Sequence, residues 1–199
     1  MSLIPVFDIG LSNAWIFELC ALLPLPILLL IQKRRASKSE KGADSKGELD
    51  YMTQAERRLF AFSRLVMFLP VIYSIFLPLK LGTTWFYVGL PIALVGSIML
   101  LAVWVKFAAA IVGDELITTG LYSYSRHPMY LSWFLMNIGI TIACASWLFL
   151  LLAIASMLFA HVRFAGFEER LCLDKYGDAY RDYMDRTPRW LGLPKSGTK

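Results

Sequence analysis

The sequence predicts an all-α membrane protein with about five transmembrane helices. Of its 199 residues, 57% are hydrophobic and only 18% are charged, and the mean hydropathy is +0.56. These values lie outside the usual range of soluble domains. Several apolar runs also approach the roughly 20 residues that an α-helix needs to cross about 30 Å of hydrocarbon. The composition therefore excludes an ordinary soluble globular domain.

Five apolar runs define the predicted spans, at residues 14–31, 59–79, 85–105, 129–143 and 147–162. The last two runs are short, and only residues 144–146 separate them, so they predict a tight helical hairpin. The first run follows Asp8 and has no lysine or arginine before it. It therefore lacks the basic start of a cleavable signal peptide, and we expect it to remain as a transmembrane segment.

The distribution of basic residues predicts the orientation of these spans. Lysine and arginine number eight in residues 33–58, one in 80–84, two in 106–128, none in 144–146 and eight in 163–199. Because cytoplasmic loops are enriched in these residues, the N-terminus is expected outside and the C-terminus in the cytoplasm. The same bias accounts for the net charge of +5, so membrane lipids, and not nucleic acid, are the expected partners.

Two regions are predicted. Residues 1–112 hold the first three spans and a polar cytoplasmic loop at 33–58, to which we assign no chemistry. Residues 113–199 hold the candidate chemistry. The three cysteines are far apart and the two histidines have no ligand-pair spacing, so no metal site is expected. No sequence feature sets the oligomeric state.

Two ionisable residues fall inside predicted spans, where an unpaired charge costs at least a few kcal/mol. Glu18 lies about a turn from the outer end of the first span, and Arg64 lies close to the inner end of the second. We expect Glu18 to reach the lipid headgroups and Arg64 to snorkel to the interface. A functional role is the alternative for both residues.

The cytoplasmic segment 113–128 leads directly into the fourth span. Pro128 suits the first turn of a helix, with Ser125 as a candidate cap. Arg126 and His127 then lie at a helix N-terminus, where free N–H groups and the helix dipole favour a carboxylate or phosphate. The alternative is an interfacial belt of tyrosine and arginine that only anchors the helix.

The tail after the fifth span alternates apolar and charged residues at helical spacing. It predicts two short amphipathic helices broken around Gly177, with the fifth helix continuing to about Lys175. Because a hairpin returns the chain to its starting side, Glu168 and Glu169 are expected to face residues 122–130. The alternative pairs these glutamates with nearby arginines on a solvated helix face.

Three motifs occur in order: Gly-Leu-Tyr at 120–122, Arg-His-Pro-Met-Tyr at 126–130, and Glu-Glu at 168–169 followed by Tyr-Gly-Asp-Ala-Tyr at 176–180 and Tyr183. In this order and spacing, residues 107–191 resemble the isoprenylcysteine carboxyl methyltransferases and their relatives among phospholipid N-methyltransferases. The resemblance implies a cytoplasmic cofactor pocket, formed by the last helical hairpin and the tail, for S-adenosyl-L-methionine.

The resemblance also implies roles for individual residues. The cofactor-binding positions are Asp114, Glu115, Leu116, Ile117, Tyr122, His127, Pro128, Met129, Tyr130 and Glu168. The candidate catalytic residues are Arg126, Glu169 and Arg163. The family places an arginine beside the methyl acceptor near the end of its last helix; an ungapped alignment puts Phe164 there, and Arg163 precedes it.

The implied function is an integral membrane methyltransferase with a lipophilic acceptor, for which the carboxylate of a prenylated cysteine is one candidate. A carboxylate or thiolate acceptor needs no base, whereas an amine must first lose a proton, with Glu169 or His127 as candidate proton acceptors. One alternative is an NADPH-dependent membrane sterol or enone reductase, since such reductases carry a similar Arg-His-Pro element. The other is a nonenzymatic membrane interaction protein.

Overall fold

The computed structural model describes residues 7–24, 26, 30, 54–113, 115–159 and 165–194. The described helices are α1 (Trp15–Leu22), α3 (Gln54–Ser74), α4 (Thr84–Gly113), the 3-10 helix η2 (Gly120–Ser123), α5 (Pro128–Cys144), α6 (Trp147–Phe159), α7 (Ala165–Tyr176) and α8 (Asp178–Arg186). Within this part of the chain, β pairing is limited to one isolated bridge between Asn13 and Pro78. The prediction of an all-α protein is therefore confirmed.

Each of the five predicted spans overlaps a described helix. In α4, the segment Thr84–Ile111 is long and apolar enough to cross a bilayer, and Leu65–Ser74, Pro128–Cys144 and Trp147–Phe159 are shorter apolar segments. The hairpin between α5 and α6 is as tight as expected, because Ala145 turns in the left-handed region at φ +49°. The number of membrane crossings stays a prediction.

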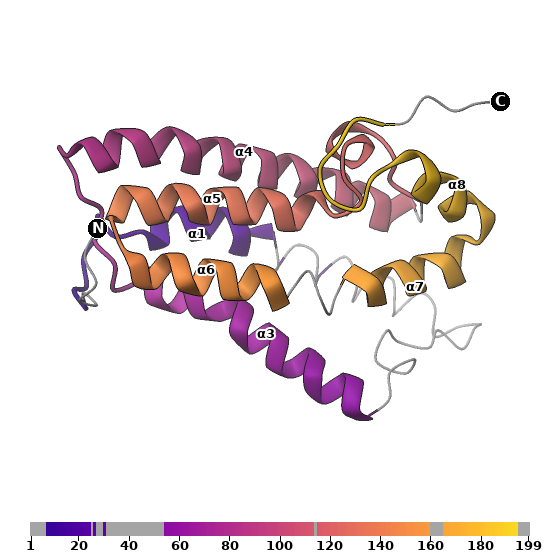
Figure 1. Cartoon of the computed structure of the whole chain (residues 1–199), viewed down its shortest axis with the longest axis horizontal. Coiled ribbons are helices and arrows are strands. Elements are labelled where there is room, and N and C mark those ends of the chain that lie inside the picture. Colours follow the sequence, from indigo (N-terminus) through magenta and orange to yellow (C-terminus); the bar gives the residue numbers. More distant parts are fainter. Residues whose placement is uncertain are drawn as a thin grey trace.

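Helices α4 and α5 lie side by side along the bundle, with α1 and α6 against them (Figure 1). Their close approach depends on glycine. A Cβ on Gly139 of α5 would lie 2.1 Å from the backbone nitrogen of Ala93 in α4, and one on Gly96 would lie 2.3 Å from the backbone nitrogen of Met136. Small residues at such contacts let helix backbones approach in membrane proteins.

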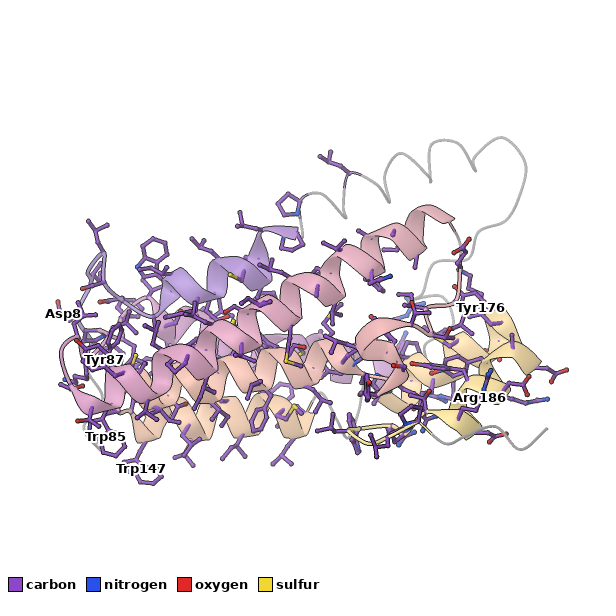
Figure 2. The ribbon with its side chains drawn as sticks, turned by 90° about the horizontal axis from the view of Figure 1, so that it is seen from above. Asp8, Trp85, Tyr87, Trp147, Tyr176 and Arg186 are labelled. Atoms are coloured by element: carbon purple, nitrogen blue, oxygen red, sulfur yellow. The ribbon has the colours of Figure 1, made fainter. Side chains whose placement is uncertain are left out.

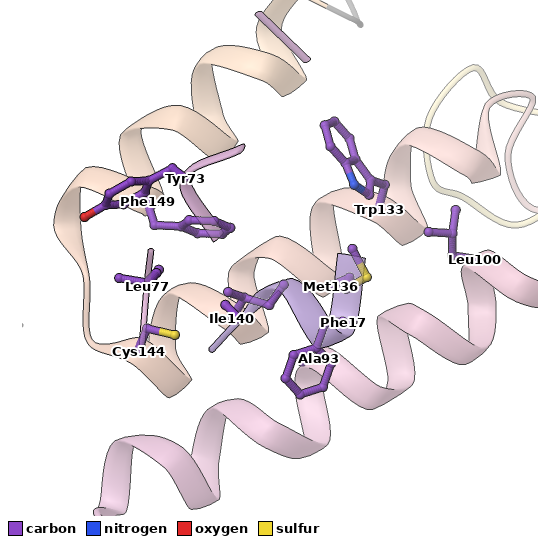
Figure 3. Packing of buried hydrophobic residues seen from close by; sticks show 11 residues of the cluster. Phe17, Tyr73, Leu77, Ala93, Leu100, Trp133, Met136, Ile140, Cys144 and Phe149 are labelled. Carbon is purple, nitrogen blue, oxygen red and sulfur yellow. The ribbon is translucent and has the colours of Figure 1, made fainter. Parts of the chain in front are cut away.

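The buried side chains around this contact form the core of the bundle (Figure 3). They come from the five helices of the bundle: Phe17 of α1, Tyr73 of α3, Ala93 and Leu100 of α4, Trp133, Met136, Ile140 and Cys144 of α5, and Phe149 of α6, with Ala14 and Leu77. This core fixes the axis of α5, whose N-terminal end carries the motif at 126–130.

We expect Gly139→Ala to destabilise the protein by about 1–3 kcal/mol, because the added methyl overlaps backbone atoms that cannot move aside independently. Gly166→Ala in α7 is the matched control, since no atom lies within 4 Å of its added Cβ; its effect should stay within about 0.5 kcal/mol. Thermal unfolding in detergent measures both. Equal melting temperatures for the two variants would contradict this account of the α4–α5 contact.

The two ends of the bundle differ in character. Figure 2 shows Asp8, Trp85, Tyr87 and Trp147 at one end, and Tyr176 and Arg186 at the other. The side chains of Trp85, Tyr87 and Trp147 are exposed, as is typical of aromatic residues at a membrane–water interface. The opposite end holds the C-terminal end of α4, the start of α5 and helices α7 and α8.

The prediction that Glu18 reaches the headgroups is wrong. Its side chain is buried, with 1% of the residue exposed, and its Oε2 accepts a hydrogen bond of 3.3 Å from the indole nitrogen of Trp133 in α5. Helix α1 packs against α3, α4 and α5, and this packing turns Glu18 into the bundle. The side chain of Arg64 lies outside the described residues.

Candidate functional site

The chain between α4 and α5 is shaped by local turn chemistry. Gly120 adopts φ +69° at the start of η2, a conformation that glycine tolerates and other residues rarely adopt. Helix α5 then begins at Pro128, as predicted, but the cap position is His127 and not Ser125. The Ser125 hydroxyl still accepts a 3.1 Å hydrogen bond from the His127 backbone N–H, so both residues fix the entry into α5.

A cavity of about 400 Å³ opens where this segment meets the tail helices, within the usual size range of small-ligand sites. Nine of the predicted cofactor-binding residues line it: Glu115, Leu116, Ile117, Tyr122, His127, Pro128, Met129, Tyr130 and Glu168. Arg126 lines it as well. The tenth predicted position, Asp114, lies outside the described residues, as does the catalytic candidate Arg163.

The tail helices supply the other wall of the cavity. Leu171, Cys172, Lys175 and Tyr176 of α7 and Tyr180 and Tyr183 of α8 line it, opposite Phe107, Ala110 and Ile111 of α4. The predicted break at Gly177 separates the two tail helices, and its φ of +54° is again a glycine conformation. Residues 160–164 lie outside the described residues, so the predicted continuity from α6 into α7 stays a prediction.

Tyrosine hydroxyls close the cavity by bonding to backbone carbonyls. Tyr183 donates to the carbonyl of Tyr122 at 2.7 Å and to that of Ser125 at 3.4 Å. Tyr176 donates to the carbonyl of Glu115 at 3.4 Å. These contacts tie α7 and α8 to the segment between α4 and α5, so the cavity is a product of the folded tail.

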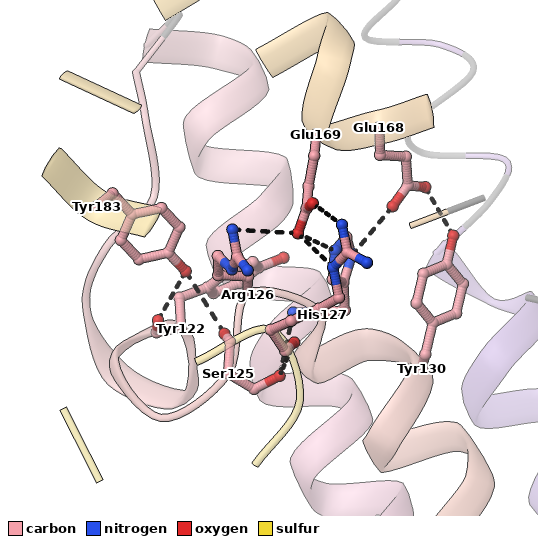
Figure 4. A network of polar contacts seen from close by, with 9 residues as sticks. Tyr122, Ser125, Arg126, His127, Tyr130, Glu168, Glu169 and Tyr183 are labelled. Carbon is pink, nitrogen blue, oxygen red and sulfur yellow. Dashed lines mark hydrogen bonds and ion pairs between the residues drawn. The ribbon is translucent and has the colours of Figure 1, made fainter. Parts of the chain in front are cut away.

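Glu168 lines the cavity, and side chains at the start of α5 hold its carboxylate (Figure 4). Its Oε1 accepts a 2.7 Å hydrogen bond from the Tyr130 hydroxyl, and its Oε2 lies 3.3 Å from Nδ1 of His127. Its side chain is 40% exposed. Glu168 is thus oriented by two groups of the α5 start while remaining accessible from the cavity.

Glu169 has the opposite environment. It is buried, with 3% of the residue exposed, and it is absent from the cavity lining. Its Oε1 lies 3.2 Å from Nε2 of His127 and 3.3 Å from Nη1 of Arg126, and Arg189 binds both of its oxygens. Burial opposes ionisation, but hydrogen bonds from His127 and Arg189 and the charges of both arginines outweigh it and lower the pKa of Glu169 to about 2.

His127 is held between the two glutamates, with one ring nitrogen facing each carboxylate. Burial disfavours its charged form, but the hydrogen bonds to Glu168 and Glu169 outweigh burial, and the pKa of His127 is raised. Since a carboxylate only accepts hydrogen bonds, both nitrogens donate when the ring is the imidazolium. The geometry therefore favours a charged His127.

The predicted convergence of Glu168 and Glu169 with residues 122–130 is confirmed by these contacts. Sequence reasoning missed Arg189, which lies twenty positions from its partner Glu169. It also missed the residues of α4 that line the cavity. The run Thr-Pro-Arg-Trp at 187–190, which follows the two predicted tail helices, was the available signal for Arg189.

Burial keeps four titratable groups of the cavity neutral: the Cys172 thiol and the hydroxyls of Tyr122, Tyr180 and Tyr183. Burial raises the pKa of Cys172 to about 11, so this thiol is a poor nucleophile at neutral pH. Burial likewise raises the pKa of Tyr122, Tyr180 and Tyr183 above the ordinary tyrosine value. The described cavity therefore combines two carboxylates, Glu115 and Glu168, with the cations Arg126 and Lys175, the imidazole of His127 and neutral aromatic groups.

The fold and the site define a helical membrane protein with a ligand-sized cavity at one end of its bundle. A family model described as phospholipid methyltransferase matches residues 79–179, just over half of the 199 residues. The chain belongs to the phospholipid methyltransferase family, and the family resemblance of the motifs is confirmed.

A curated relative is the protein-S-isoprenylcysteine O-methyltransferase of Schizosaccharomyces pombe. It is 27% identical over 84 residues, which cover 39% of this chain and 33% of the relative. The chain thus matches about a third of the length of that protein.

Proposed function

We propose that the protein is an S-adenosyl-L-methionine-dependent methyltransferase of the membrane, acting on a lipophilic acceptor at its cytoplasmic face. Membership of the phospholipid methyltransferase family supports the reaction class. The observation that carries the proposal is the cavity of about 400 Å³, lined by nine positions implied to bind the cofactor. Five membrane crossings, with the N-terminus outside, belong to the same proposal.

The residues of the cavity fit this cofactor. Tyr122, Tyr130 and Tyr180 offer aromatic faces, which attract cations such as a sulfonium. Arg126 keeps two buried guanidinium nitrogens, Nε and Nη1, without a hydrogen-bond partner among the described residues, although Nη1 lies in ion-pair range of Glu169. A ligand carboxylate would satisfy these donors. When bound, the cofactor supplies an electrophilic methyl group; the chain's own residues orient it and exclude water.

The electrostatics favour an acceptor that has no proton to lose. The contacts of His127 with two carboxylates raise its pKa and favour its charged form, and Glu169 is a weak base because its pKa is lowered to about 2. Glu168 already accepts hydrogen bonds from Tyr130 and His127. We therefore assign Glu169 a positioning role and favour a carboxylate acceptor, whose oxygen bonds to the methyl carbon while the carbon–sulfur bond breaks and its electron pair stays on sulfur. The name of the yeast relative, an O-methyltransferase, agrees with this choice.

Calorimetry on detergent-purified protein tests the cofactor assignment. We expect S-adenosyl-L-methionine to bind, and Glu168→Gln to weaken binding about tenfold or more, because charged hydrogen bonds contribute about 1.5–3 kcal/mol. Tyr130→Phe removes the hydrogen bond from the Tyr130 hydroxyl to Glu168 and should weaken binding to a smaller extent. Asp174→Asn, at an exposed position of α7, is the matched control and should bind like the native protein.

The same titrations with NADPH separate the competing functions. Binding of NADPH without S-adenosyl-L-methionine would replace the proposal with a reductase. Binding of neither molecule would leave a nonenzymatic interaction protein as the better reading. Methylation restricted to fully water-soluble acceptors would overturn the lipophilic acceptor while leaving the reaction class intact.

A further inference from the structure

Residues 188–192, which we call the C-terminal clasp, close over the start of α5. The carbonyl of Pro188 accepts a 3.1 Å hydrogen bond from the Arg126 backbone N–H, and the carbonyl of Arg189 accepts one of 3.3 Å from the Ser125 hydroxyl. Gly192 donates from its backbone to the carbonyl of Tyr124 at 3.1 Å. The family match ends at residue 179, so the clasp lies beyond the matched segment.

From this clasp, Arg189 reaches the buried carboxylate of α7. Its Nε donates to Oε1 of Glu169 at 3.0 Å, and its Nη2 contacts Oε2. The paired contact uses the planar fork of the guanidinium, which fixes the plane of a carboxylate as well as its charge. Arg189 thereby links the clasp to α7, while its own side chain stays outside the cavity lining.

Glu169, in turn, fixes the imidazole of His127. The ring nitrogens of His127 face Glu168 and Glu169, and the imidazole also contacts the rings of Tyr130 and Trp190, with ring centroids 5.8 Å and 5.6 Å away. Arg126 is the remaining described charge at this cluster, 3.3 Å from Glu169. A continuous chain of contacts therefore runs from Arg189 through Glu169 and His127 to the cavity carboxylate of Glu168.

We propose that Arg189 is a positioning residue for the cofactor cavity, acting through Glu169 to hold His127 and Glu168 in place. Docking of the clasp and filling of the cavity are then coupled, because each favours the same arrangement of this chain. The effect on cofactor affinity rests on the proposed function. The effect on His127 does not, because it depends only on the contacts between the protein's own side chains.

NMR titration of the histidines measures the pKa of His127 and tests this network without any ligand. The chain has two histidines, His127 and His161, so ring-labelled protein gives two resonances, and a His161→Gln variant assigns them. We expect Arg189→Gln to raise the pKa of His127, because loss of a cation leaves the negative charge of Glu169 less compensated. Arg186→Gln is the matched control; this exposed arginine bonds to the Asp182 carbonyl and should leave the pKa unchanged.

Affinity for S-adenosylhomocysteine, measured by calorimetry, is the second readout. We expect Arg189→Gln to weaken it about tenfold, within the range of couplings inside one polar network. In a Glu169→Gln background, the further substitution of Arg189 should change neither the affinity nor the pKa of His127 appreciably. Arg189→Lys keeps the positive charge but loses the paired contact of the planar guanidinium with Glu169. It should therefore leave the pKa of His127 nearly unchanged while weakening the affinity for S-adenosylhomocysteine.

Two outcomes would overturn the proposal. An unchanged His127 pKa in Arg189→Gln would show that Arg189 does not act on the imidazole. Additive effects of Arg189→Gln and Glu169→Gln would show that Arg189 acts by another route. If the native protein fails to bind S-adenosylhomocysteine while the pKa shift is present, the proposed function fails and the positioning role stands.

Discussion

Replacement of Glu169 by alanine is expected to destabilise the protein by about 3–5 kcal/mol, the cost of removing one partner from a buried ion cluster. The substitution leaves Arg126, Arg189 and His127 close together without the carboxylate that all three contact. Equilibrium unfolding in a mild detergent, followed by circular dichroism, measures the loss.

Glu168→Ala is the control for this prediction, since it removes the neighbouring carboxylate from the same turn of α7. The Glu168 side chain is 40% exposed, whereas that of Glu169 is 4% exposed. Partly solvated ion pairs contribute about 1 kcal/mol or less to stability. Glu168→Ala should therefore change the free energy of unfolding little, and its main effect should be weaker cofactor binding. Equal destabilisation by both alanine variants would contradict the division of roles between the two glutamates.

The pH dependence of the free energy of unfolding provides an independent check on the role of Glu169. The pKa of Glu169 is lowered from 4.5 to about 2, so its contribution is complete above its ordinary value and is lost as the pH falls through about 2. The pKa of His127 is raised from 6.5, so its contribution is complete below 6.5 and is lost as the pH rises through the raised value. Glu169→Ala should remove the first dependence and weaken the second.

The helices of this protein could be predicted from composition because their cause is local. Long apolar runs, a proline at the start of α5 and a glycine between α7 and α8 set where helices begin and end. The hairpin of α5 and α6 then brings the two ends of residues 113–199 together. From this geometry alone, the convergence of Glu168 and Glu169 with residues 122–130 could be predicted.

The partners within the site could not be predicted in the same way. Arg189 meets Glu169 because α8 and the clasp reverse the chain across the start of α5, and such a reversal has no periodic signal. The roles of the two adjacent glutamates also depend on the rotation of α7, which places one at the cavity and the other behind it. Adjacent identical residues give no sequence feature that distinguishes them.

The rotation of α1 was beyond sequence reasoning for a related reason. Its residues are apolar on nearly every side, so no stripe indicates which face meets the bundle. Glu18 was therefore placed by its depth along the span, which suggested the headgroups. Packing of α1 against three other helices sets its rotation and buries the Glu18 carboxylate beside Trp133.

Trp133→Ala should destabilise the protein by about 3–5 kcal/mol, the usual cost of truncating a large buried aromatic residue. Trp133 is 8% exposed within the core, and its indole N–H is the hydrogen-bond donor to Glu18. Trp147→Ala is the control, because this tryptophan is 43% exposed at the start of α6, and its loss should cost much less.

Trp133→Phe separates the hydrogen bond from the packing, since it keeps most of the ring and removes the donor. It should cost about 1–3 kcal/mol in native protein, because the buried oxygen of Glu18 loses its partner, and less in a Glu18→Leu background, where no carboxylate remains. Equal costs in the two backgrounds would show that the ring alone stabilises α5. A smaller cost in the Glu18→Leu background would show that a buried carboxylate joins α1 to the helix that begins at the cavity.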